Sequence, residues 1–514
     1  MPTALFSLTD KSGMDSFARA LVQQGWTLLA SGGTAAELRK SGLNVRQVAD
    51  YTGSPEILNG RVKTLHPKIY AGILARTTQE DEIDLETIGA LYIDLVVVNL
   101  YPFQEIASQP GVELDKVVEN IDIGGVGLIR AAAKNFGRVA VVVDPADYGN
   151  ILAEIELKHV ISLETRLKLA QKAFALTSKY DQAIYHYFVG LSEGENQSVI
   201  PLNLTLYPIQ ELRYGENPHQ EAMLFGYQAG QGPLGGNLLQ GKALSYNNLL
   251  DLDAAWRAVV QFEKPTVVIA KHLSPCGIAS AKDLNEAYLK AYASDPVSAY
   301  GSVIAVNSTL DENTVHSLGE LFIECLAAPA FTKAALDLLK ARKNLRLLEI
   351  TDLTSEPQVE YRSVNRGMLR QTIDNGDPTQ NNSQIGINWK VVTERQPDEQ
   401  EWGNLYFAWK ACQHVKSNAI VFARDEATVG IGGGQPNRVD CVRIAGQRAG
   451  DRTLGAVMAS DAFFPFPDSI ELAAEMGITA IVQPGGSIRD QESIDMANQH
   501  QVAMVFTGYR HFRH

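Results

Sequence analysis

Apolar β-branched runs alternate with amphipathic stretches along the first 150 residues. Runs at 5–8, 26–30, 95–103 and 139–144 predict buried strands, and helical periodicity separates them. Strands that alternate with helices indicate a parallel sheet with helices on both faces. A helical pattern then covers about 163–188, and the polar, glycine-containing stretch 190–198 is interpreted as a linker.

A looser version of the same plan occurs twice in the rest of the chain. Strands are predicted at 266–270, 303–306, 419–423 and 456–460, each next to a polar or glycine-containing loop. The similarity of the two sets indicates an internally duplicated α/β unit. The Asn-, Gln- and Gly-rich stretch 374–387 predicts an exposed insertion loop. The basic and aromatic ending 509–514, by itself, reads as a frayed tail.

Composition narrows the class of protein. A chain of 514 residues with 45% hydrophobic and 20% charged residues fits about three globular domains, or two large ones. The net charge of −14 argues against non-specific nucleic-acid binding. There is no basic, apolar signal peptide and no run that could span a bilayer, so we expect no membrane association. Four scattered cysteines show no disulfide or zinc-ribbon spacing and suit a reducing cytoplasm: Cys276, Cys325, Cys412 and Cys441.

Lys271 and His272 directly follow the predicted strand 266–270, and Pro275 and Gly277 are expected to turn the chain after them. Open α/β sheets bind ligands at the carboxyl ends of their strands. A lysine there can stabilise developing negative charge, and a histidine can exchange protons near neutral pH. The dipeptide alone supports a surface lysine beside a structural histidine equally well.

The first 150 residues carry further candidate groups. Ser31-Gly32-Gly33-Thr34 lies between a strand and a helix, a layout that can hold a phosphate at the helix N-terminus. A plain glycine turn with Thr34 as N-cap explains the same letters. Other polar residues gather at 61–66, at the end of the strand 95–103 and before the helix that carries Arg130. Arg130 itself is also compatible with a solvated helix surface.

Phe463, Phe464 and Phe466 form an aromatic cluster interrupted by Pro465. The cluster fits either a protein core or a hydrophobic shelf for a flat heterocycle.

Several motifs, in order and over nearly the whole chain, resemble the family that combines AICAR formyltransferase with IMP cyclohydrolase. They are SGGT from Ser31, GRVKTLHP from Gly60, NLYPF from Asn99, IDIGG from Ile121, AAAKN from Ala131, RYGENPHQ from Arg213, KHLSPCG from Lys271, KSNAI from Lys416, IGGGQPNR from Ile431 and SDAFFPF from Ser460, with the basic-aromatic ending.

The resemblance implies a methylglyoxal-synthase-like parallel-sheet domain at 1–198 that carries the cyclohydrolase. It implies a duplicated cytidine-deaminase-like α/β region at 199–514 that carries the formyltransferase. The expected reactions are the last two steps of IMP synthesis, formyl transfer from 10-formyltetrahydrofolate to AICAR and dehydrative closure of formyl-AICAR. A homodimer in the cytoplasm is expected.

The same resemblance assigns site residues. In the formyltransferase it makes Lys271, His272 and Asn418 catalytic, and it lines the nucleotide and folate pocket with Arg213, Tyr214, Asn248, Tyr300, Gly301, Glu324, Arg438, Phe463, Phe466 and Arg510. In the cyclohydrolase it makes Lys63, Tyr101, Asp122 and Lys134 catalytic, and it assigns substrate binding to Lys11, Ser31, Gly33, Thr34, Arg61, Thr64 and Asn99.

Two departures from the family pattern matter. Tyr300 and Glu324 stand where some members carry Phe and Asp. The H-x-E and P-C-x-x-C zinc ligands of the deaminases are missing around Cys276, so we expect no catalytic metal. Folate is expected as a co-substrate, with no tightly bound cofactor.

The chemistry follows from the groups. The acceptor is a poorly nucleophilic aromatic amine, so His272 is expected as general base, with Lys271 and the Asn418 amide stabilising the oxyanion. Ring closure is intramolecular and depends on orientation. Two rival hypotheses are a regulatory protein that binds a phosphosugar nucleotide, and a pyridoxal enzyme with Lys271 as its Schiff-base lysine.

Overall fold

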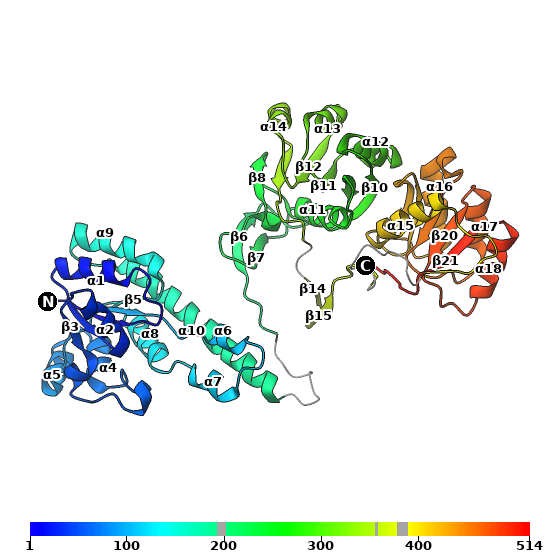
Figure 1. Cartoon of the computed structure of the whole chain (residues 1–514). Coiled ribbons are helices and arrows are strands. Elements are labelled where there is room, and N and C mark those ends of the chain that lie inside the picture. The colour runs from blue at the N-terminus through cyan, green and yellow to red at the C-terminus, as the bar shows by residue number, and fades with distance from the viewer. Residues whose placement is uncertain (193–201, 355–357, 378–388) are drawn as a thin grey trace. The chain divides into compact units, whose positions relative to one another are not determined.

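The computed structural model describes residues 1–192, 202–354, 358–377 and 389–514, and the chain divides into two compact units, Met1–Asn203 and Leu204–His514 (Figure 1). The domain boundary expected at 198/199 lies outside the described residues. Each unit has its own hydrophobic core.

Unit 1 is built on a five-stranded sheet in the order β3-β2-β1-β4-β5, with every pairing parallel. The predicted parallel sheet is therefore confirmed. The strand order reverses between β1 and β4. Open α/β sheets have their ligand crevice at the carboxyl ends of the strands at such a point. The strands are β1 (Thr3–Ser7), β2 (Thr27–Ala30), β3 (Val45–Gln47), β4 (Leu95–Val98) and β5 (Ala140–Val142).

Helices flank the sheet on both faces, with α1 and α9 on one side and α4 and α8 on the other (Figure 1). The predicted long helix is confirmed as α10, but it continues to Ser192, so Gly190–Ser192 is helical and not linker. The helices are α1 (Met14–Gln23), α2 (Gly32–Lys40), α3 (Val48–Thr52), α4 (Pro67–Leu74), α5 (Gln79–Ile88), α6 (Phe103–Ala107), α7 (Leu114–Glu119), α8 (Gly124–Lys134), α9 (Tyr148–Lys158) and α10 (Leu163–Ser192).

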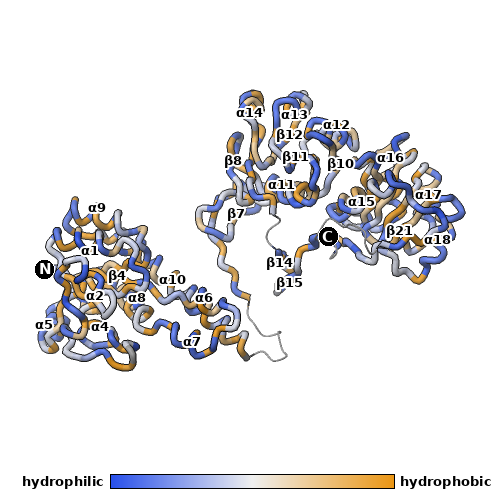
Figure 2. Tube along the Cα trace, viewed as in Figure 1, coloured by the Kyte–Doolittle hydropathy of each residue, from blue (hydrophilic) through white to orange (hydrophobic). Residues whose placement is uncertain are grey.

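Unit 2 is organised around a mixed sheet in the order β16-β21-β20-β19-β17-β18-β10-β9-β11-β12-β13-β8. Its strands are among the most hydrophobic segments of the unit (Figure 2). The strands are β8 (Asn237–Gln240), β9 (Thr266–Lys271), β10 (Ser274–Ser280), β11 (Ser302–Val306), β12 (Ile323–Ala328), β13 (Arg346–Glu349), β16 (Lys390–Val391), β17 (Ala419–Arg424), β18 (Ala427–Gly433), β19 (Val457–Ser460), β20 (Ala480–Gln483) and β21 (Ala503–Phe506).

The strands on the two sides of the sheet's centre follow the same order of connection and the same pairing directions. From β10 the order is β9, β11, β12, β13, β8, and from β18 it is β17, β19, β20, β21, β16, with the same sequence of antiparallel and parallel pairings. The helices match as well, with α11 (Tyr246–Val259) and α12 (Leu284–Ser294) in the first half and α15 (Glu399–Gln413) and α16 (Arg438–Ala449) in the second.

The other elements of unit 2 complete the two halves. They are α13 (Glu312–Ser317), α14 (Lys333–Leu339), α17 (Asp468–Glu475) and α18 (Asp490–Gln499), and the two separate hairpins β6 (Tyr207–Leu212) with β7 (Ala222–Gly226) and β14 (Val359–Val364) with β15 (Gly367–Thr372).

Two local predictions for unit 2 are wrong. The chain turns at His272 and Leu273, whereas Pro275 and Gly277 lie inside β10. Strand β9 is antiparallel to both neighbours, and Lys271 is its last residue. The C-terminal tail is not frayed, because His511 is buried and its N–H donates to Asp461 O.

The predicted insertion loop 374–387 is only partly described. Asp374 and Asn375 at its start are exposed, as expected. Asp377 is buried and accepts hydrogen bonds from Trp389 and Trp409, so the prediction is wrong at this residue. Residues 378–387 lie outside the described ranges.

Candidate active sites

The crevice of unit 1 is fixed by a side chain at the end of β4. Asn99 accepts the N–H of Thr9 at 2.7 Å and donates to Asp10 O at 2.7 Å. Its amide therefore holds the loop after β1 against the loop after β4. Asn99, expected as a substrate ligand, shapes the crevice through these backbone contacts.

The start of α2 forms a second wall of the crevice. Ser31 is the N-cap residue, so the alternative that Thr34 caps the helix is wrong. The buried Thr34 hydroxyl instead accepts Leu8 N–H at 3.0 Å and donates to Leu8 O at 3.1 Å. The first N–H groups of a helix have no partner within it, so this turn can receive an anion. A Cβ placed on Gly32 would lie 3.0 Å from the Glu56 carboxylate, which sequence reasoning did not single out.

Asp122 lies two residues before the start of α8, and its carboxylate accepts the Gly125 N–H at 2.6 Å. Burial raises the pKa of Asp122, while the N–H groups of Gly125 and Tyr101 and the charge of Lys63 act against this rise. The carboxyl group is thus close to both Tyr101 and Lys63. A carboxyl group in such a position can serve as a general acid or base.

Thr64 and Tyr70 pack against the first turns of α8. A Cβ on Gly124 would come within 2.6 Å of Thr64 Oγ1, and a Cβ on Gly127 within 2.2 Å of the Tyr70 hydroxyl oxygen. Glycine is required at both positions for this close approach. Burial raises the pKa of Tyr70, and the charge of Asp122 adds to it. Tyr70 was missed from the sequence because it lies in an ordinary helical pattern.

Other expected residues of unit 1 are placed differently. Lys134 ends α8 whereas Asp122 precedes its start, so about 15 Å of helix separates the two backbones. The structure therefore does not bring Lys134 to the Asp122 group. Arg61 forms an exposed ion pair with Glu119 at 2.9 Å, and Lys11 is exposed on the loop after β1.

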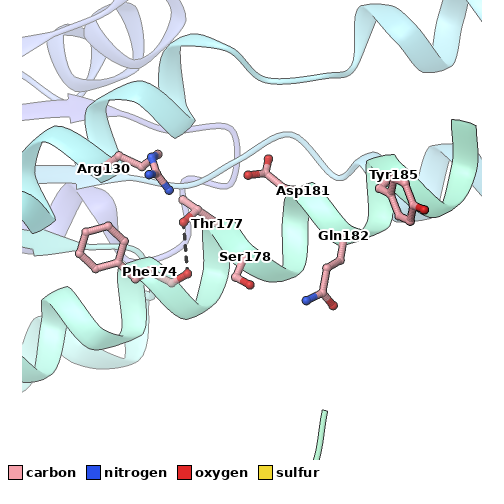
Figure 3. Close-up of a pocket in the computed structure, with 7 residues that line it drawn as sticks. All are labelled: Arg130, Phe174, Thr177, Ser178, Asp181, Gln182 and Tyr185. Atoms are coloured by element: carbon pink, nitrogen blue, oxygen red, sulfur yellow. Dashed lines mark hydrogen bonds between the residues drawn. The ribbon is translucent and has the colours of Figure 1, made fainter. Parts of the chain in front are cut away.

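An open groove of about 540 Å³ runs along α10 next to α8 (Figure 3). The Arg130 guanidinium lies 5.8 Å from the centre of the Phe174 ring in this groove. Its lining contains none of the expected site residues, so we assign it no catalytic role: Arg130, Phe174, Thr177, Ser178, Asp181, Gln182 and Tyr185.

In unit 2, Lys271 and His272 lie at the tip of the β9–β10 hairpin. Lys271 Nζ donates to Tyr300 O at 2.7 Å, and Gly301 borders both Lys271 and Phe322. The Tyr300 and Phe322 rings lie 5.4 Å apart, and both are exposed. The expected residues Lys271, His272, Tyr300 and Gly301 thus form one cluster, and Phe322 adds an aromatic surface that the sequence did not reveal.

A second cluster surrounds Asn418, on the same edge of the sheet. Antiparallel pairing brings the carboxyl end of β9 and the amino end of β17 to this edge, with β10 and β18 between them. The buried Arg438 forms an ion pair with Asp461 and donates to Asn418 Oδ1 at 2.7 Å. Asn418 Nδ2 donates to Gln435 O at 2.8 Å and Pro436 O at 3.1 Å. Arg438 therefore orients Asn418, and the Asn418 amide hydrogens are already engaged.

Two further expected residues also have structural partners. Glu324 forms a 2.7 Å ion pair with Arg346. Asn248 completes a capping box with Ser245 at the start of α11. These contacts limit the polar atoms that the two residues can offer to a ligand.

The β6–β7 hairpin loop carries Arg213 and Tyr214, with the guanidinium 5.5 Å from the ring centre. Asn247 Nδ2 donates to Glu216 O at 3.3 Å, which ties this loop to the start of α11. Arg213 and Tyr214 therefore lie on a loop attached beside Asn248.

The aromatic cluster after β19 divides between core and surface. Phe464 is fully buried, whereas Phe463 is 38% and Phe466 52% exposed. Two of the three rings are thus at the surface, and the Arg489 guanidinium lies 4.9 Å from the centre of the Phe466 ring. Arg510 is exposed next to Phe512, in the tail that follows β21.

Within the described residues, no group of three or more His, Cys, Asp or Glu side chains is arranged to hold a metal ion, and no helix is long and apolar enough to cross a membrane. The four cysteines are free, and burial raises the pKa of Cys276 to about 12.

Comparison with known proteins decides the family. The sequence model of the AICARFT/IMPCHase bienzyme family matches residues 132–448, and that of the MGS-like domain matches residues 13–127. The chain belongs to the AICARFT/IMPCHase bienzyme family. It is a bifunctional enzyme of purine biosynthesis that combines AICAR formyltransferase and IMP cyclohydrolase activity. Unit 1 contains the MGS-like domain, and the formyltransferase reaction implies a folate co-substrate.

Curated relatives match over their full length. The bifunctional purine biosynthesis protein PurH of Acetivibrio thermocellus is 46% identical over 99% of both chains. The PurH proteins of Nostoc punctiforme and a Cyanothece species are 48% and 49% identical over 99% and 100% of both chains. The crystal structure of ForH is 36% identical, covers 38% of this chain and all of its own, and has a TM-score of 0.35.

Proposed function

We propose that unit 2 transfers the formyl group at the tip of the β9–β10 hairpin and that unit 1 closes the ring beside Asp122. The observation that carries the first assignment is the position of His272. It is exposed, lies next to Lys271 and makes no hydrogen bond or ion pair with the described part of the chain. An uncommitted imidazole next to a cation suits a general base for an acyl transfer.

In formyl transfer, the amine nitrogen of AICAR attacks the formyl carbon of 10-formyltetrahydrofolate while His272 accepts the amine proton. The resulting oxyanion is stabilised by Lys271, whose ammonium has further donors beyond its bond to Tyr300 O. The C–N bond to tetrahydrofolate then breaks, and N10 takes a proton. Because the Asn418 amide is already engaged, we assign Asn418 to shaping this edge, in place of the oxyanion role expected from the sequence.

The substrate pocket is proposed along the same edge of the sheet. Phe463 and Phe466 would contact the folate heterocycle, and Tyr300 with Gly301 would border the nucleotide. The further binding residues are proposed from the family resemblance: Arg213, Tyr214, Asn248, Glu324, Arg438 and Arg510.

In ring closure, the carboxamide nitrogen of formyl-AICAR attacks the formyl carbon and water leaves. Asp122 is suited to move a proton, because it is a buried carboxyl group whose pKa is raised by burial. Lys63 can stabilise the developing oxyanion, and Tyr101 and Thr64 border the same space. The turn 31–34 would bind the 5′-phosphate, with Lys11 and Arg61 near the crevice; Lys134 rests on the resemblance alone.

The broader architecture is part of the proposal. The symmetric strand order of unit 2 supports a duplicated cytidine-deaminase-like region, and the two compact units support a boundary near residue 198. A homodimer in the cytoplasm without a tightly bound cofactor follows from the family resemblance, and the missing deaminase zinc ligands around Cys276 are the ground for proposing no catalytic metal. Metal independence is tested by exhaustive chelation, and activity that zinc specifically restored would contradict it.

Two variants test the assignment of both sites. His272→Ala is expected to lower formyl transfer by roughly 10²- to 10⁴-fold and to leave the cyclisation of supplied formyl-AICAR unchanged. Asp122→Asn should show the opposite pattern. Each half-reaction is assayed separately, and a variant that loses both or neither contradicts its assignment.

Separate fragments test the boundary. A fragment of residues 1–198 should cyclise formyl-AICAR by itself, and one that starts at Pro201 should transfer formyl without cyclising. Folding and oligomeric state are checked first. If the folded first fragment cyclises only after the second is added, the cyclohydrolase site is shared between them.

A further inference from the structure

The turn that presents His272 has an unusual sequence for its backbone shape. His272 has a φ of 55° and Leu273 a φ of 65°, and Lys271 pairs with Ser274 across the turn. Two-residue hairpin turns with positive φ at both positions strongly favour Asn and Gly. Leucine and histidine there cost conformational free energy, so other contacts must hold the turn.

One such contact comes from α11. Asp251 Oδ1 accepts the N–H of Leu273 at 2.7 Å. The acceptor is a carboxylate on a half-buried helix, a more rigid support than a loop. It fixes the peptide that directly follows His272, and therefore the direction in which the imidazole projects.

The second half of unit 2 contains the same support with a different residue. Asn404 Oδ1, on α15, accepts the N–H of Glu426 at 3.1 Å, in the turn between β17 and β18. Asp425 and Glu426 have φ values of 54° and 53°. An amide oxygen thus holds the equivalent turn, so the negative charge of Asp251 is not needed for the turn itself.

We propose that Asp251 is a positioning residue for formyl transfer, which holds the His272–Leu273 turn so that the imidazole meets the AICAR amine. This inference rests on the proposed role of His272. It predicts an effect on the chemical step, because Asp251 acts through the turn and does not contact the proposed ligands itself.

Four variants in the full-length enzyme test it. Asp251→Ala removes the acceptor, Asp251→Asn keeps an uncharged one, and Asp251→Glu moves the carboxylate by one methylene. Asn404→Ala removes the equivalent acceptor from the other hairpin and is the matched control. Formyl transfer is measured at saturating substrates for kcat and over a substrate range for the KM of AICAR and of 10-formyltetrahydrofolate.

Asp251→Ala and Asp251→Glu should lower kcat roughly 10- to 100-fold, because the imidazole is no longer held in the productive orientation, with both KM values changed by less than about twofold. Asp251→Asn should restore kcat to within about threefold of wild type. Asn404→Ala should leave kcat within about twofold. Amide hydrogen exchange should speed up in peptides covering 271–276 for Asp251→Ala and 424–429 for Asn404→Ala.

The outcomes distinguish a failure of the proposed role of His272 from a failure of the proposed role of Asp251. Near-normal transfer by His272→Ala overturns the role of His272. If His272→Ala is inactive but folded Asp251→Ala or Asp251→Glu keeps normal kcat, only the Asp251 inference is overturned. A kcat loss in Asn404→Ala equal to that in Asp251→Ala would also overturn it, because the effect would then be general destabilisation. Should Asp251→Ala not fold, the comparison of Asp251→Glu with Asp251→Asn decides.

Discussion

The two central hairpins of unit 2 share one backbone and differ in their tips. The β9–β10 hairpin turns at His272 and Leu273, and the β17–β18 hairpin at Asp425 and Glu426, with positive φ at all four residues. In each, a six-residue strand precedes the turn and a seven-residue strand follows it. The backbone framework is therefore common to both halves.

The residues that tether the hairpins also correspond. Lys271 donates to Tyr300 O at 2.7 Å, and Arg424 to Leu454 O at 2.8 Å. A glycine with a φ of 72° follows each acceptor, Gly301 in one half and Gly455 in the other. In each half, the last residue of the first hairpin strand (β9 or β17) is thus bound to the loop that precedes its other neighbour in the sheet (β11 or β19).

The tip side chains of the two hairpins differ in whether they have partners. In the second, Asp425 accepts from Gln400 Nε2 at 2.9 Å and Glu426 pairs with Lys264 at 2.6 Å, so both are engaged. In the first, His272 is exposed and has no such partner among the described residues. The fold thus provides the same turn in both halves. The first turn alone carries a side chain, His272, that has no partner among the described residues and can act as a base.

The largest difference between the two hairpins is expected when their tip residues are exchanged and the rate of formyl transfer is measured. His272→Asp should lower formyl transfer roughly 10²- to 10⁴-fold, because the general base is lost. The fold should persist, since aspartate already occupies the equivalent turn. The reciprocal Asp425→His should leave transfer within about twofold. Transfer rates and thermal melts of both variants check this, and equal losses at the two tips would contradict the asymmetry.

The strands could be predicted from the sequence because their chemistry is local. The runs 266–270 and 419–423 are mostly apolar and include β-branched residues. The first lies inside β9 and the second inside β17. The turn after β9 could not be predicted, because His272 and Leu273 carry no turn signal. The contact that supports the turn comes from Asp251, on a different helix.

The burial and contacts of site residues could not be predicted where they depend on partners far away in the sequence. Asp122 could be selected as a polar residue, but its burial against α8 depends on Gly125 and on the loop after β4. His511 lies between Asp374 and Asp377, more than 130 positions earlier in the chain, so its buried state was invisible in a terminal sequence. The exposure of Phe463 and Phe466 around a buried Phe464 likewise needed the structure.

Matched glycines test whether the two hairpins are structurally equivalent. A Cβ on Gly277 would lie 2.0 Å from Ala291 O, and one on Gly430 2.1 Å from Ala445 O. Gly277→Ala and Gly430→Ala should each lower the free energy of unfolding by roughly 1–3 kcal/mol, because strand and helix backbones must separate. Denaturant unfolding of unit 2 measures both values. A large loss in one half and none in the other would show that the packing is not shared.

The C-terminal tail adds a pH dependence to the second half of unit 2. Burial by itself would lower the pKa of His511, but Asp374 and Asp377 outweigh it and raise the pKa from 6.5 to about 9. A raised folded-state pKa stabilises fully below pH 6.5, and this stabilisation is lost as the pH rises through about 9. The melting temperature of unit 2 should therefore fall by a few degrees between pH 7 and pH 10.

His511→Gln is the control for that fall. Glutamine keeps a donor but does not titrate, so this variant should melt lower at pH 7 and lose less between pH 7 and pH 10. His414 cannot account for a fall at high pH: burial, aided by the charge of Arg513, lowers its pKa to about 3, so its effect belongs to acid conditions. An equal decrease in wild type and His511→Gln would exclude His511 as the source.

The smallest effect is expected from the ion pair that engages the second tip. Lys264 and Glu426 are 61% and 36% exposed, and exposed pairs contribute roughly 0.2–1 kcal/mol. Lys264→Met should therefore lower the free energy of unfolding by less than about 1 kcal/mol, with a difference that shrinks as salt is added. Asn404 still holds the Glu426 N–H in this variant, so the turn should keep its shape and formyl transfer should stay within about twofold of wild type. Chemical unfolding at low and high ionic strength, with parallel transfer assays, measures both quantities. A loss of several kcal/mol that salt does not reduce would mean that the ion pair, and not the helix-borne acceptor, holds the second tip.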